Sequence, residues 1–520
     1  MAKQYLMSID EGTMSSRASI VDLDGNILGS SGAEYGTISP NPGWYEQDCS
    51  LMVSVIYDSC KGAIKNAGID PKEIAAIALS SQGAAFCPVD KDNRLVRPTI
   101  GWQDTRGSVM LDEIAGLVSP EELYQISGAP LATVWTISKI LWMKKYEPEN
   151  YEKTACFALH QDYFLRTLGV EKHYADISSA ARYGFFDVDN HRYSEKLLKL
   201  FDIPEEKLPV IVDGGTQVGA ITAEVSKATG IPEGTPVCVG AMDVTCAILG
   251  LGITKEKMAA TILGTYGTCI SLSSKPVRDP NGSMVLIGNT GTNMWTIEGS
   301  VLAAASSYRW YRDTFGDLEV AAGKVLNTDP FDLINKQIAS GKPGAKGVLY
   351  MPHLASAGPP RNNPNAKGIF LGLTFAHTKA DIARSVMEGI SLEIRDIITA
   401  KSGMGIDVNR IRLTGGGSKS PMWNQIQADV YGKTVQTVQT SETASVGAAM
   451  LAAVGVGIFK NVQEAAEAMV RVTRTYEPVA ANTKVYDELY DIYCSTCESL
   501  ASPEYNVYKK INDFQNKLGL

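Results

Sequence analysis

The feature that most constrains the fold is a pattern that occurs twice along the chain: a strand, a Gly-Thr turn and a returning strand. The first copy surrounds Asp10-Glu-Gly-Thr13, and the second surrounds Leu263-Gly-Thr265. Strands are predicted on both sides of each turn, over 5–9, 18–22, 258–263 and 268–272. A chain built from two such halves places both turns at one cleft between two domains, and such clefts commonly bind ligands.

Between and after these turns the chain alternates helical and strand patterns. In the first half, apolar residues at helical spacing predict a helix over 51–67, followed by a strand over 74–79. The second half is predicted to contain helices over 244–251 and 381–400, a surface loop over 357–367, a strand over 411–414 and a helical tail after Lys484. Since 520 residues exceed one ordinary core, the sequence predicts an α/β protein of two domains.

Composition argues against several other classes of protein. The net charge is −9 without a basic run, so no nucleic-acid surface is expected. The most apolar late segment, 448–459, is short and interrupted by glycine, so we expect no membrane span. The chain opens without the apolar core of a signal peptide, and its nine scattered cysteines fit reduced thiols. A cytoplasmic location is therefore expected.

The first turn combines a carboxylate with groups that suit phosphate. Asp10 fits Mg²⁺, which favours few carboxylates together with water and phosphate oxygens. Backbone N–H groups freed at Gly12 and the hydroxyl of Thr13 can hold phosphate oxygens. Taken alone, the segment also fits an ordinary hydrophilic hairpin.

Two further turns offer the same chemistry. Gly264-Thr265 stands in the corresponding place of the second half and can hold phosphate in the same way. Gly415-Gly-Gly-Ser418 enters a helix that begins near Pro421, and could pack beneath a nucleotide base or its α-phosphate. A glycine run at such a junction is also a common structural turn.

Five longer segments, in a fixed order along the chain, carry a family resemblance. They are 10–18, Pro42-Gly-Trp-Tyr-Glu-Gln-Asp48, Thr136-x-x-Lys139-Ile-x-Trp142, 368–373 with Asp381-Ile-x-x-Ser-Val-Met-Glu388, and 415–423. In these segments the chain resembles the FGGY carbohydrate kinases, and it is nearest to the xylulose and pentulose kinases. The segments resemble the first phosphate segment, a tryptophan loop, two signatures and the adenosine segment of that family.

The resemblance implies an α/β fold of two actin-like, ribonuclease-H-like ATPase domains with a cleft between them. It implies a sugar-binding domain with the catalytic base at 1–250, and an ATP-binding domain with a helical tail at 251–520. ATP and Mg²⁺ are the expected cofactors. The expected ATP contacts are Gly12, Thr13, Ser16, Arg17, Gly264, Thr265, Gly416, Gly417 and Ser418.

The resemblance also assigns the catalytic base. Val239-Gly-Ala-Met-Asp243 is similar to the family segment that ends in the catalytic aspartate. A carboxylate within reach of the sugar hydroxyl can accept its proton during phosphoryl transfer. Asp243 is therefore expected to be the base, to contact the sugar and to share the metal with Asp10. Without the resemblance, Asp243 would more simply be read as a helix N-cap before Val244.

The sugar-side segments do not agree on one substrate. Where this chain has Gln82-Gly83-Ala84, glycerol kinases carry Gln-Arg-Glu and xylulose kinases carry Gln-Met-His. The L-xylulose-type kinases, with Ala-Gln-Gly, resemble this segment of the chain more. Trp102 and Asp104 resemble the family segment beside the sugar, where Asp104 can accept two hydroxyl hydrogens and Trp102 can pack on a carbon chain. Gln82, Gly83, Trp102 and Asp104 are the expected substrate contacts, together with Asp243.

Two other segments favour a ketopentose and one opposes xylulose itself. His160-Gln-Asp162-Tyr and 176–181 resemble segments of the pentulose group, but 354–360 lacks the Gly-Glu-Arg-x-Pro of xylulose kinases. The sequence thus predicts ATP-dependent phosphorylation of a small sugar or polyol, with a ketopentose such as xylulose first. Another polyol, a sugar acid or an autoinducer-2-type substrate stays open, as does a sugar-binding regulator derived from a kinase. A homodimer is expected from family analogy alone.

Overall fold

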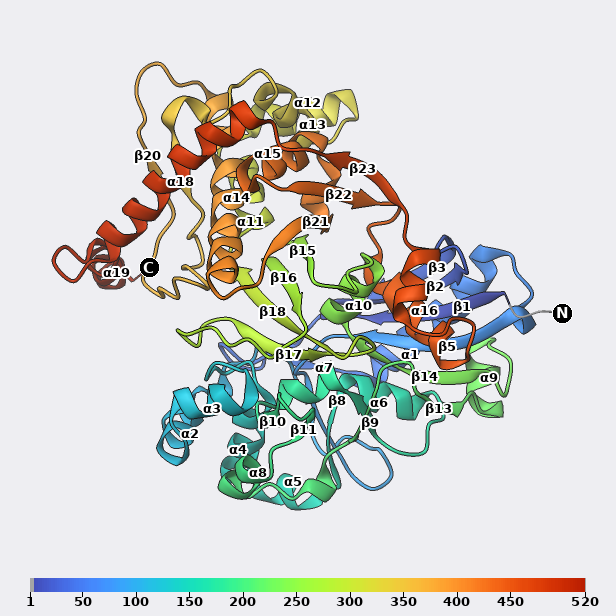
Figure 1. Cartoon of the computed structure of the whole chain (residues 1–520). Helices are drawn as coiled ribbons and strands as arrows, with labels where there is room; N and C mark the ends of the chain where they lie inside the picture. Colours follow the sequence, from blue (N-terminus) through green and yellow to red (C-terminus); the bar gives the residue numbers. More distant parts are fainter. Residues whose placement is uncertain (1–3, 520) are drawn as a thin grey trace.

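The computed structural model describes residues 4–519, and its two largest sheets repeat one order of strands (Figure 1). The first sheet runs β13 (Gln217–Ala220), β14 (Pro236–Met242), β5 (Ile74–Ser81), β1 (Tyr5–Glu11), β2 (Ser15–Asp22) and β3 (Ile27–Glu34). The second runs β23 (Val472–Tyr476), β22 (Thr434–Val438), β21 (Val408–Thr414), β15 (Lys257–Leu263), β16 (Gly267–Ser273), β18 (Met294–Val301) and β17 (Val285–Asn289). The sheets therefore correspond strand by strand, with β17 added to the second.

The strand directions repeat as well. β1 pairs antiparallel with β2 and parallel with β5, and β15 pairs antiparallel with β16 and parallel with β21. The next strands repeat this too, since β14 is parallel to β5 and β22 is parallel to β21. The duplication predicted from the two Gly-Thr turns is thus confirmed in the topology. This is the arrangement expected of two actin-like domains, with both turns at equivalent hairpins.

Two helices cross between the sheets, and each contacts the sheet that it does not follow, although α10 also packs on β14 and β5 of its own sheet. α10 (Asp243–Gly250) follows β14, but its Ile248 belongs to an apolar cluster with Met258 and Ile270 of the second sheet. α16 (Thr443–Gly455) follows β22, but it packs on β1, β5 and β14 of the first sheet. Because α10 and α16 also contact each other, the two halves are joined through this helix pair.

The crossing of α10 and α16 depends on two glycines. A Cβ at Gly250 would lie 1.8 Å from the carbonyl oxygen of Thr443. A Cβ at Gly447 would lie 1.9 Å from the carbonyl oxygen of Cys246. Each helix thus contributes a glycine that lets the backbone of the other come into contact. The relationship is reciprocal, as in a pseudo-symmetric pair.

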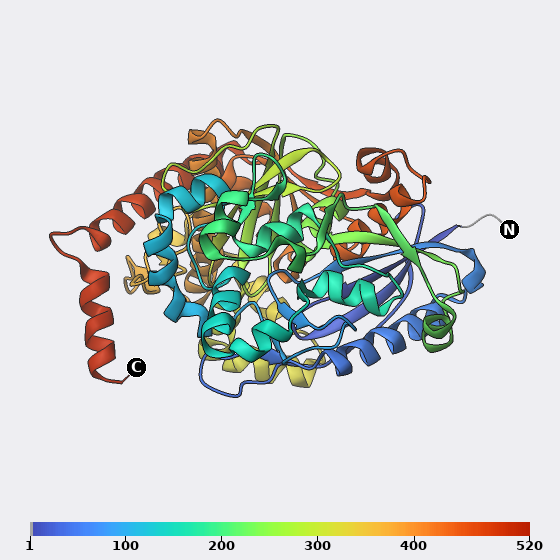
Figure 2. The same cartoon turned by 90° about the horizontal axis from the view of Figure 1, so that it is seen from below.

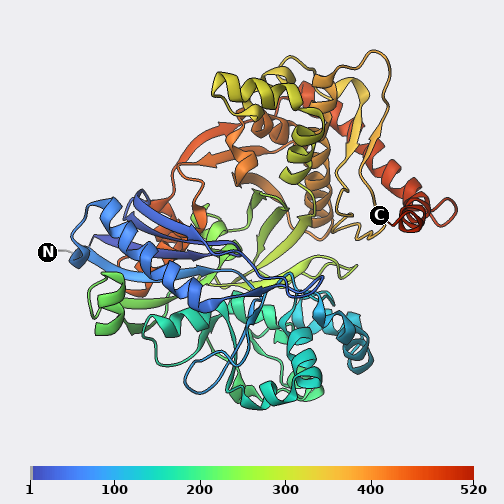
Figure 3. The same cartoon turned by 180° about the vertical axis from the view of Figure 1, so that it is seen from behind.

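The long helix α1 (Cys49–Ala67) covers the outer part of the first sheet, where it contacts β2 and β3 (Figure 3). Its buried face is formed by Met52, Ile56, Cys60 and Ala63, which recur at helical spacing. The carboxylate of Asp48 caps its N-terminus by accepting the N–H groups of Ser50 and Leu51. The helix predicted over 51–67 is therefore confirmed and begins two residues earlier.

A large insert lies between β5 and β13, and it forms the part of the molecule nearest the viewer in Figure 2. Its helices are α2 (Leu111–Leu117), α3 (Pro120–Ser127), α4 (Thr136–Tyr146), α5 (Pro148–Lys153), α6 (His160–Thr167), α7 (Ile177–Ala180) and α8 (Glu195–Phe201). Its strands are β6 (Phe86–Val89), β7 (Thr99–Ile100), β8 (Cys156–Leu159), β9 (Tyr174–Asp176), β10 (Phe186–Asp187), β11 (Arg192–Tyr193) and β12 (Val210–Val212). β6, β7 and β8 form a small sheet with β4 (Glu46–Gln47), and α9 (Ala223–Thr229) follows β13.

The second half carries its own insert and a helical tail. These elements are α11 (Ala305–Phe315), α12 (Asp317–Leu326), α13 (Pro330–Ile338), β19 (Leu349–Met351), β20 (Ile369–Leu371), α14 (Lys379–Gly403), α15 (Pro421–Tyr431), α17 (Val462–Met469), α18 (Ala480–Ala501) and α19 (Val507–Lys517). Helices α18 and α19 extend to the side away from the N-terminus (Figure 1). Within residues 4–519, no helix is both long and apolar enough to cross a membrane.

Candidate active site

Asp10 and Asp243 meet at one edge of the first sheet. β1, β5 and β14 are parallel neighbours, so their carboxyl ends lie at the same edge, where α/β proteins commonly bind ligands. Asp10 is paired in register with Ser80 of β5, and Met242, just before Asp243, is paired with Ser81. The topology thus brings together two carboxylates that are more than two hundred residues apart in sequence.

The pKa of each carboxylate is raised, and the charge of Asp10 contributes to the rise at Asp243. Burial raises the pKa of Asp10 to about 6. A hydrogen bond of 2.7 Å from the hydroxyl of Ser80 acts in the opposite direction. Burial and the nearby charge of Asp10 raise the pKa of Asp243 to about 7, while the N–H of Val244 and the guanidinium of Arg182 act in the opposite direction. A carboxylate with a pKa near neutrality suits a group that accepts a proton during catalysis.

Asp243 does not cap α10 from outside the helix. It is the first residue of α10, the capping position being Met242, and its carboxylate accepts the adjacent N–H of Val244 at 2.7 Å. The capping interpretation therefore does not describe its position, and the carboxylate stands where β14 ends.

The first Gly-Thr turn differs in one detail from the prediction. The N–H of Gly12 donates to the carbonyl of Ser15 at 3.0 Å, so this amide closes the turn and is not free for phosphate. The hydroxyl of Thr13 accepts the indole N–H of Trp102 at 2.9 Å, which leaves its own proton available. Ser16 is buried on β2, whereas Arg17 is exposed. Thr13 and Arg17 are thus the accessible members of this predicted set.

The second turn is built in the same way. The N–H of Gly264 donates to the carbonyl of Tyr266 at 3.0 Å, so this amide is also used within its turn. The carbonyls of Gly264 and Thr265 accept the N–H groups of Ala305 and Ala304, which anchors the start of α11. The side chain of Thr265 is exposed. The two turns therefore correspond in topology, and each uses its glycine N–H internally, although the acceptor is three residues on in the first turn and two residues on in the second.

The glycine run after β21 is shaped by close packing on one side and open space on the other. Gly415 has φ +87°, and a Cβ there would lie 2.6 Å from the carbonyl oxygen of Leu263. A Cβ at Gly416 would meet nothing within 4 Å, so its face is open to a ligand. Gly417 packs on Leu263 and Trp423 instead. The run thus has both a structural and an accessible part.

A cavity of about 370 Å³ adjoins this run. Ser418 and Asn424 line it on one side, Thr437 to Ser441 at the end of β22 and just after it line another, and Tyr476 of β23 also lines it. The cavity lies at the carboxyl ends of β21 and β22, the edge that corresponds to Asp10 and Asp243 in the first sheet. Its volume is in the range of small-molecule sites.

Gln82 and Gly83 continue the edge formed by Asp10 and Asp243. The amide of Gln82 donates to the carboxylate of Glu11 at 2.7 Å and to the carbonyl of Gly12 at 3.1 Å, which holds the first turn in place. A Cβ at Gly83 would lie 2.6 Å from the sulfur of Met242 and 3.3 Å from Cγ of Arg182. The space that a larger side chain would take at Gly83 is therefore filled by these two residues.

Asp104 is placed differently from the prediction. Its carboxylate is fully buried and accepts four hydrogen bonds, three from Arg106 and one from the N–H of Tyr45, at 2.7–2.9 Å. Four bonds use the capacity of a carboxylate, so the expected contact with two sugar hydroxyls does not fit. Instead Asp104 fastens the tryptophan loop at 42–48 to the loop that carries Trp102. Trp102 itself is half-buried and faces Thr13.

Three charged residues of the site were not predicted. Arg182 lies beside Gly83 and Met242 and acts on the pKa of Asp243; its position directly after the segment 176–181 was the available signal. Glu442 precedes α16, lies 3.7 Å from Arg17 and raises the pKa of Asp10. Lys139 is buried in α4 and donates to the carbonyl of Ala84. The signature segment that contains Lys139 therefore holds the turn at Gly83 in place.

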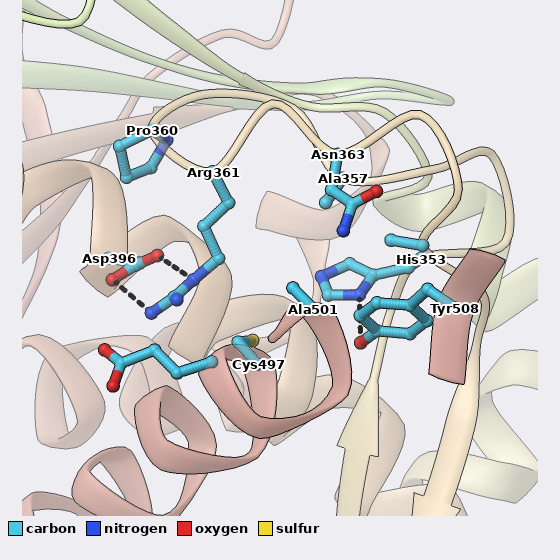
Figure 4. A pocket seen from close by; sticks show the side chains of 11 residues that line it. His353, Ala357, Pro360, Arg361, Asn363, Asp396, Cys497, Ala501 and Tyr508 are labelled. Atoms are coloured by element: carbon cyan, nitrogen blue, oxygen red, sulfur yellow. Dashed lines mark hydrogen bonds and ion pairs between the residues drawn. The ribbon is translucent and has the colours of Figure 1, made fainter. Parts of the chain in front are cut away.

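Another cavity, of about 350 Å³, lies apart from these residues (Figure 4). It is enclosed by the loop at 357–366 and by helices α14, α18 and α19. In it Arg361 is paired with Asp396, and the ring of His353 faces the hydroxyl of Tyr508 (Figure 4). The loop whose sequence departs from xylulose kinases thus contributes to this cavity next to the tail.

Comparison with known proteins agrees with the geometry. The xylulose kinase of Staphylococcus xylosus is 29% identical over 490 residues, which cover 94% of this chain and 99% of that relative. The gluconokinase of Bacillus subtilis (strain 168) is 26% identical over 515 residues, or 99% of both chains. The crystal structure of xylulose kinase from Rhodospirillum rubrum superposes with a TM-score of 0.87 at 25% identity, covering 97% of this chain and 100% of that one.

The similarity also extends to the family level. Residues 5–250 match the N-terminal domain of the FGGY family of carbohydrate kinases, and residues 259–456 match its C-terminal domain. Together these matches cover both sheets apart from β23, and they include both Gly-Thr turns, Asp10, Asp243 and the glycine run. Such kinases transfer a phosphoryl group from ATP to a sugar. The chain therefore belongs to the FGGY family of carbohydrate kinases.

Proposed function

We propose that this kinase transfers the terminal phosphoryl group of ATP to one hydroxyl of a ketopentose such as xylulose. The observation that carries the proposal is the pair of carboxylates, Asp10 and Asp243, at the shared edge of β1 and β14. The substrate rests on the similarity to xylulose kinases over nearly the whole chain. Residues 1–250 would then bind the sugar, and residues 251–520 the nucleotide.

In the proposed reaction, Asp243 accepts the proton of the sugar hydroxyl. The hydroxyl oxygen forms a bond to the γ-phosphorus of ATP, the bond from that phosphorus to the β-phosphate oxygen breaks, and ADP leaves with the electron pair. A pKa of about 7 lets Asp243 be ionised at neutral pH and still hold a proton as the hydroxyl becomes acidic.

The nucleotide is proposed to lie between the two Gly-Thr turns, with its adenosine at the glycine run. Thr13 and Thr265 offer accessible hydroxyls to the phosphates, and Arg17 adds a positive charge on the same side. The open face of Gly416 and the cavity beside Ser418 would receive the adenosine. The buried position of Ser16 argues against a direct contact from that residue.

The donor set fits a magnesium ion. The charge of Asp10 raises the pKa of Asp243, and Glu442 adds a third negative charge that raises the pKa of Asp10, so a divalent cation would relieve this repulsion. Hard cations prefer such carboxylate oxygens. Asp10 and Asp243 would hold the ion, which neutralises phosphate charge when bound.

A sugar acid is the second candidate, and Arg182 is the observation that favours it. Its side chain is largely buried, packs over Trp135 and takes the space beside Gly83, next to the proposed base. A carboxylate on the substrate could pair with this guanidinium, and the Bacillus subtilis gluconokinase is among the full-length relatives. Glu298 lies 3.7 Å from Arg182 and would compete for it.

A substrate panel distinguishes these candidates. Sugar-dependent ADP release would be measured with xylulose enantiomers, ribulose, gluconate, glycerol and an autoinducer-2-type diketone, and the product position read by NMR. The highest kcat/KM with a ketopentose supports the proposal, and the highest with gluconate supports the second candidate. ATP binding without turnover on any sugar would instead favour a sugar-binding regulator.

Replacing Arg182 separates the two candidates further. With gluconate, Arg182→Gln should raise KM by about tenfold or more, as expected for loss of a charged hydrogen bond, and Arg182→Lys should restore part of the affinity. With a ketopentose, which has no carboxylate, the change should be smaller.

We further propose a cytoplasmic location, supported by nine cysteines that all occur as free thiols. The homodimer expected from family analogy stays a prediction. Size-exclusion chromatography with light scattering would measure it directly.

A further inference from the structure

Two thiols and an imidazole meet beneath the first Gly-Thr turn. Cys49 begins α1, Cys87 lies in β6 and His160 begins α6, so three separate elements contribute one side chain each. Their ligand atoms all lie within 4.8 Å of one another, and each of the three residues is at most 1% exposed. None of them is used by the proposed phosphoryl transfer.

The imidazole is oriented by a carboxylate. Nδ1 of His160 lies 3.1 Å from Oε1 of Glu11, while Nε2 faces the sulfur of Cys49 at 4.0 Å. A hydrogen bond from Nδ1 to a carboxylate fixes the tautomer in which Nε2 is free to bind a metal, an arrangement typical of histidine ligands of zinc. Glu11 itself is fully buried and also holds Ser81 and Gln82.

The thiols share a polar neighbour as well. The hydroxyl of Thr99 lies 3.0 Å from the sulfur of Cys49 and 3.2 Å from that of Cys87. It has a single proton, so it can donate to one sulfur and support it as a thiolate. The trio therefore has hydrogen-bonding groups around it of the kind that tune a metal site.

The dimensions and the charges suit zinc. Zinc bound to two thiolates and an imidazole sets these ligand atoms roughly 3.5–3.8 Å apart. The observed 4.0 Å from Nε2 to the sulfur of Cys49 is close to that separation. Since no two ligand atoms are more than 4.8 Å apart, each distance between them would have to shorten by roughly 1 Å at most when zinc binds. Zn²⁺ cancels the charge of the two thiolates, so the ion and its thiolates add no net charge to this buried position, where Glu11 stays hydrogen-bonded to His160.

We propose that Cys49, Cys87 and His160 supply three of the four ligands of a buried Zn²⁺ site, with the hydroxyl of Thr99, 3.0 and 3.2 Å from the two sulfurs, available for the fourth position. Binding would release the two thiol protons and join α1, the small sheet of the insert and α6 at one point. Since His160 is bonded to Glu11, and Glu11 to Gln82, the ion would also stiffen the support of the phosphate turn. This site is separate from the magnesium ion proposed for Asp10 and Asp243, and it does not depend on the proposed substrate.

Zinc content of the full-length protein tests the proposal. The protein would be produced in zinc-supplemented medium and purified without chelator or a histidine tag, then measured by plasma mass spectrometry. We expect about one zinc per chain in the unaltered protein and below about 0.1 in the double variant Cys49→Ser/Cys87→Ser. Growth with Co²⁺ should give a sulfur-to-cobalt charge-transfer band that is absent from the double variant.

Matched variants identify the ligands. Cys60→Ser changes another buried thiol of α1, and Cys156→Ser changes a thiol beside Asp162 and His173, the other group of side chains with suitable spacing. Both should keep the zinc and the cobalt band. Zinc below about 0.1 per chain in the unaltered protein, or zinc lost from Cys156→Ser but kept by the double variant, would overturn the proposal.

Stability provides a second readout if the double variant folds poorly. The unaltered protein would be unfolded with chelator and refolded with and without added Zn²⁺. We expect the zinc-refolded protein to unfold at a higher temperature, because binding to the folded state alone stabilises it. Equal unfolding temperatures of the two refolded samples would count against the site.

Discussion

The indole nitrogen of Trp102 donates to the hydroxyl of Thr13 across 2.9 Å, and this bond joins the loop proposed to contact the sugar to the turn proposed to contact phosphate. Gln82 makes a second connection, through its bonds to Glu11 and to the carbonyl of Gly12. The loop with Trp102, the residue Gln82 and the first Gly-Thr turn are therefore one hydrogen-bonded unit. A change on the sugar side should be felt by both substrates.

Trp102→Phe tests this connection, because it keeps the ring and removes the N–H. Loss of one hydrogen bond should lower kcat/KM by about 3- to 10-fold, with KM rising for sugar and for ATP. Steady-state kinetics with each substrate varied in turn would measure it. Trp295→Phe is the matched control, since it removes an indole bond of 2.8 Å to Val188 outside the first turn. Equal effects of the two variants would contradict the connection.

Asp243→Asn should separate chemistry from binding. The amide keeps the size of the side chain but cannot accept the proton of the sugar hydroxyl, so turnover should fall by ~10²- to 10⁴-fold. Affinity for ATP and sugar, measured by calorimetry, should change little by comparison. Asp24→Asn, an exposed carboxylate in the turn after β2, serves as control and should behave like the unaltered protein. Near-normal turnover of Asp243→Asn would remove it from the role of base.

The raised pKa of Asp243 predicts the pH dependence of activity. The base must be ionised, so kcat/KM measured without excess metal should decline below about pH 7, by tenfold for each unit of pH. A profile that stays flat down to pH 5 would contradict the assignment.

Asp10 predicts a pH dependence of stability with a defined sign. In the folded chain its pKa is about 6, above the ordinary value of 3.8, so the folded state binds this proton more tightly than the unfolded state. Below about pH 4 both states are protonated, and above about pH 6 the folded state carries a buried charge that destabilises it. At pH 8, Asp10→Asn should therefore unfold at a higher temperature than the unaltered protein. The difference between the two unfolding temperatures should shrink towards pH 4. A difference that grows on acidification would contradict this sign.

Gly83→Ala should affect the sugar and not the nucleotide. The new Cβ would lie 2.6 Å from the sulfur of Met242 and 3.3 Å from Cγ of Arg182, so both side chains must move next to the proposed base. We expect KM for the sugar to rise by about tenfold, equivalent to the ~1–3 kcal/mol typical of overpacking, while KM for ATP stays near its original value. Gly116→Ala, where a Cβ meets nothing within 4 Å, is the control. A rise confined to the KM for ATP would contradict the placement of Gly83.

The sequence predicted the frame of the site better than its contacts. The repeated turns and the strand pattern depend on local residues, and the topology confirmed them. The roles of Asp104 and Gly12 depend on partners that fold next to them: Arg106 and Tyr45 take up the carboxylate of Asp104, and Ser15 takes the N–H of Gly12.

Arg182 escaped prediction for the same physical reason. Its place directly after 176–181 does not by itself indicate that it meets Gly83, which follows β5, and Met242 of β14. The carboxylate–imidazole pair of Glu11 and His160 likewise joins residues 149 positions apart. Such contacts follow from the tertiary fold rather than from spacing.

The crossing of α10 and α16 gives the last prediction, because two acidic residues of the candidate site depend on it. Asp243 begins α10 and Glu442 immediately precedes α16, so a shift of one helix moves a carboxylate. In Gly447→Ala the new Cβ would stand 1.9 Å from the carbonyl oxygen of Cys246, and backbone cannot give way as a side chain does. The helices must separate, and the loss of stability should be about 1–3 kcal/mol or more, with a fall in kcat.

Thermal unfolding and kinetics of the same variants would measure both effects. Gly250→Ala should behave like Gly447→Ala, because its Cβ would stand 1.8 Å from the carbonyl oxygen of Thr443 on the reciprocal side. Gly116→Ala, on the exposed face of α2, should leave kcat unchanged and unfold at the same or a slightly higher temperature, since alanine favours a helix. If Gly447→Ala unfolded and turned over like Gly116→Ala, the close contact of the two helices would not be what positions Asp243 and Glu442.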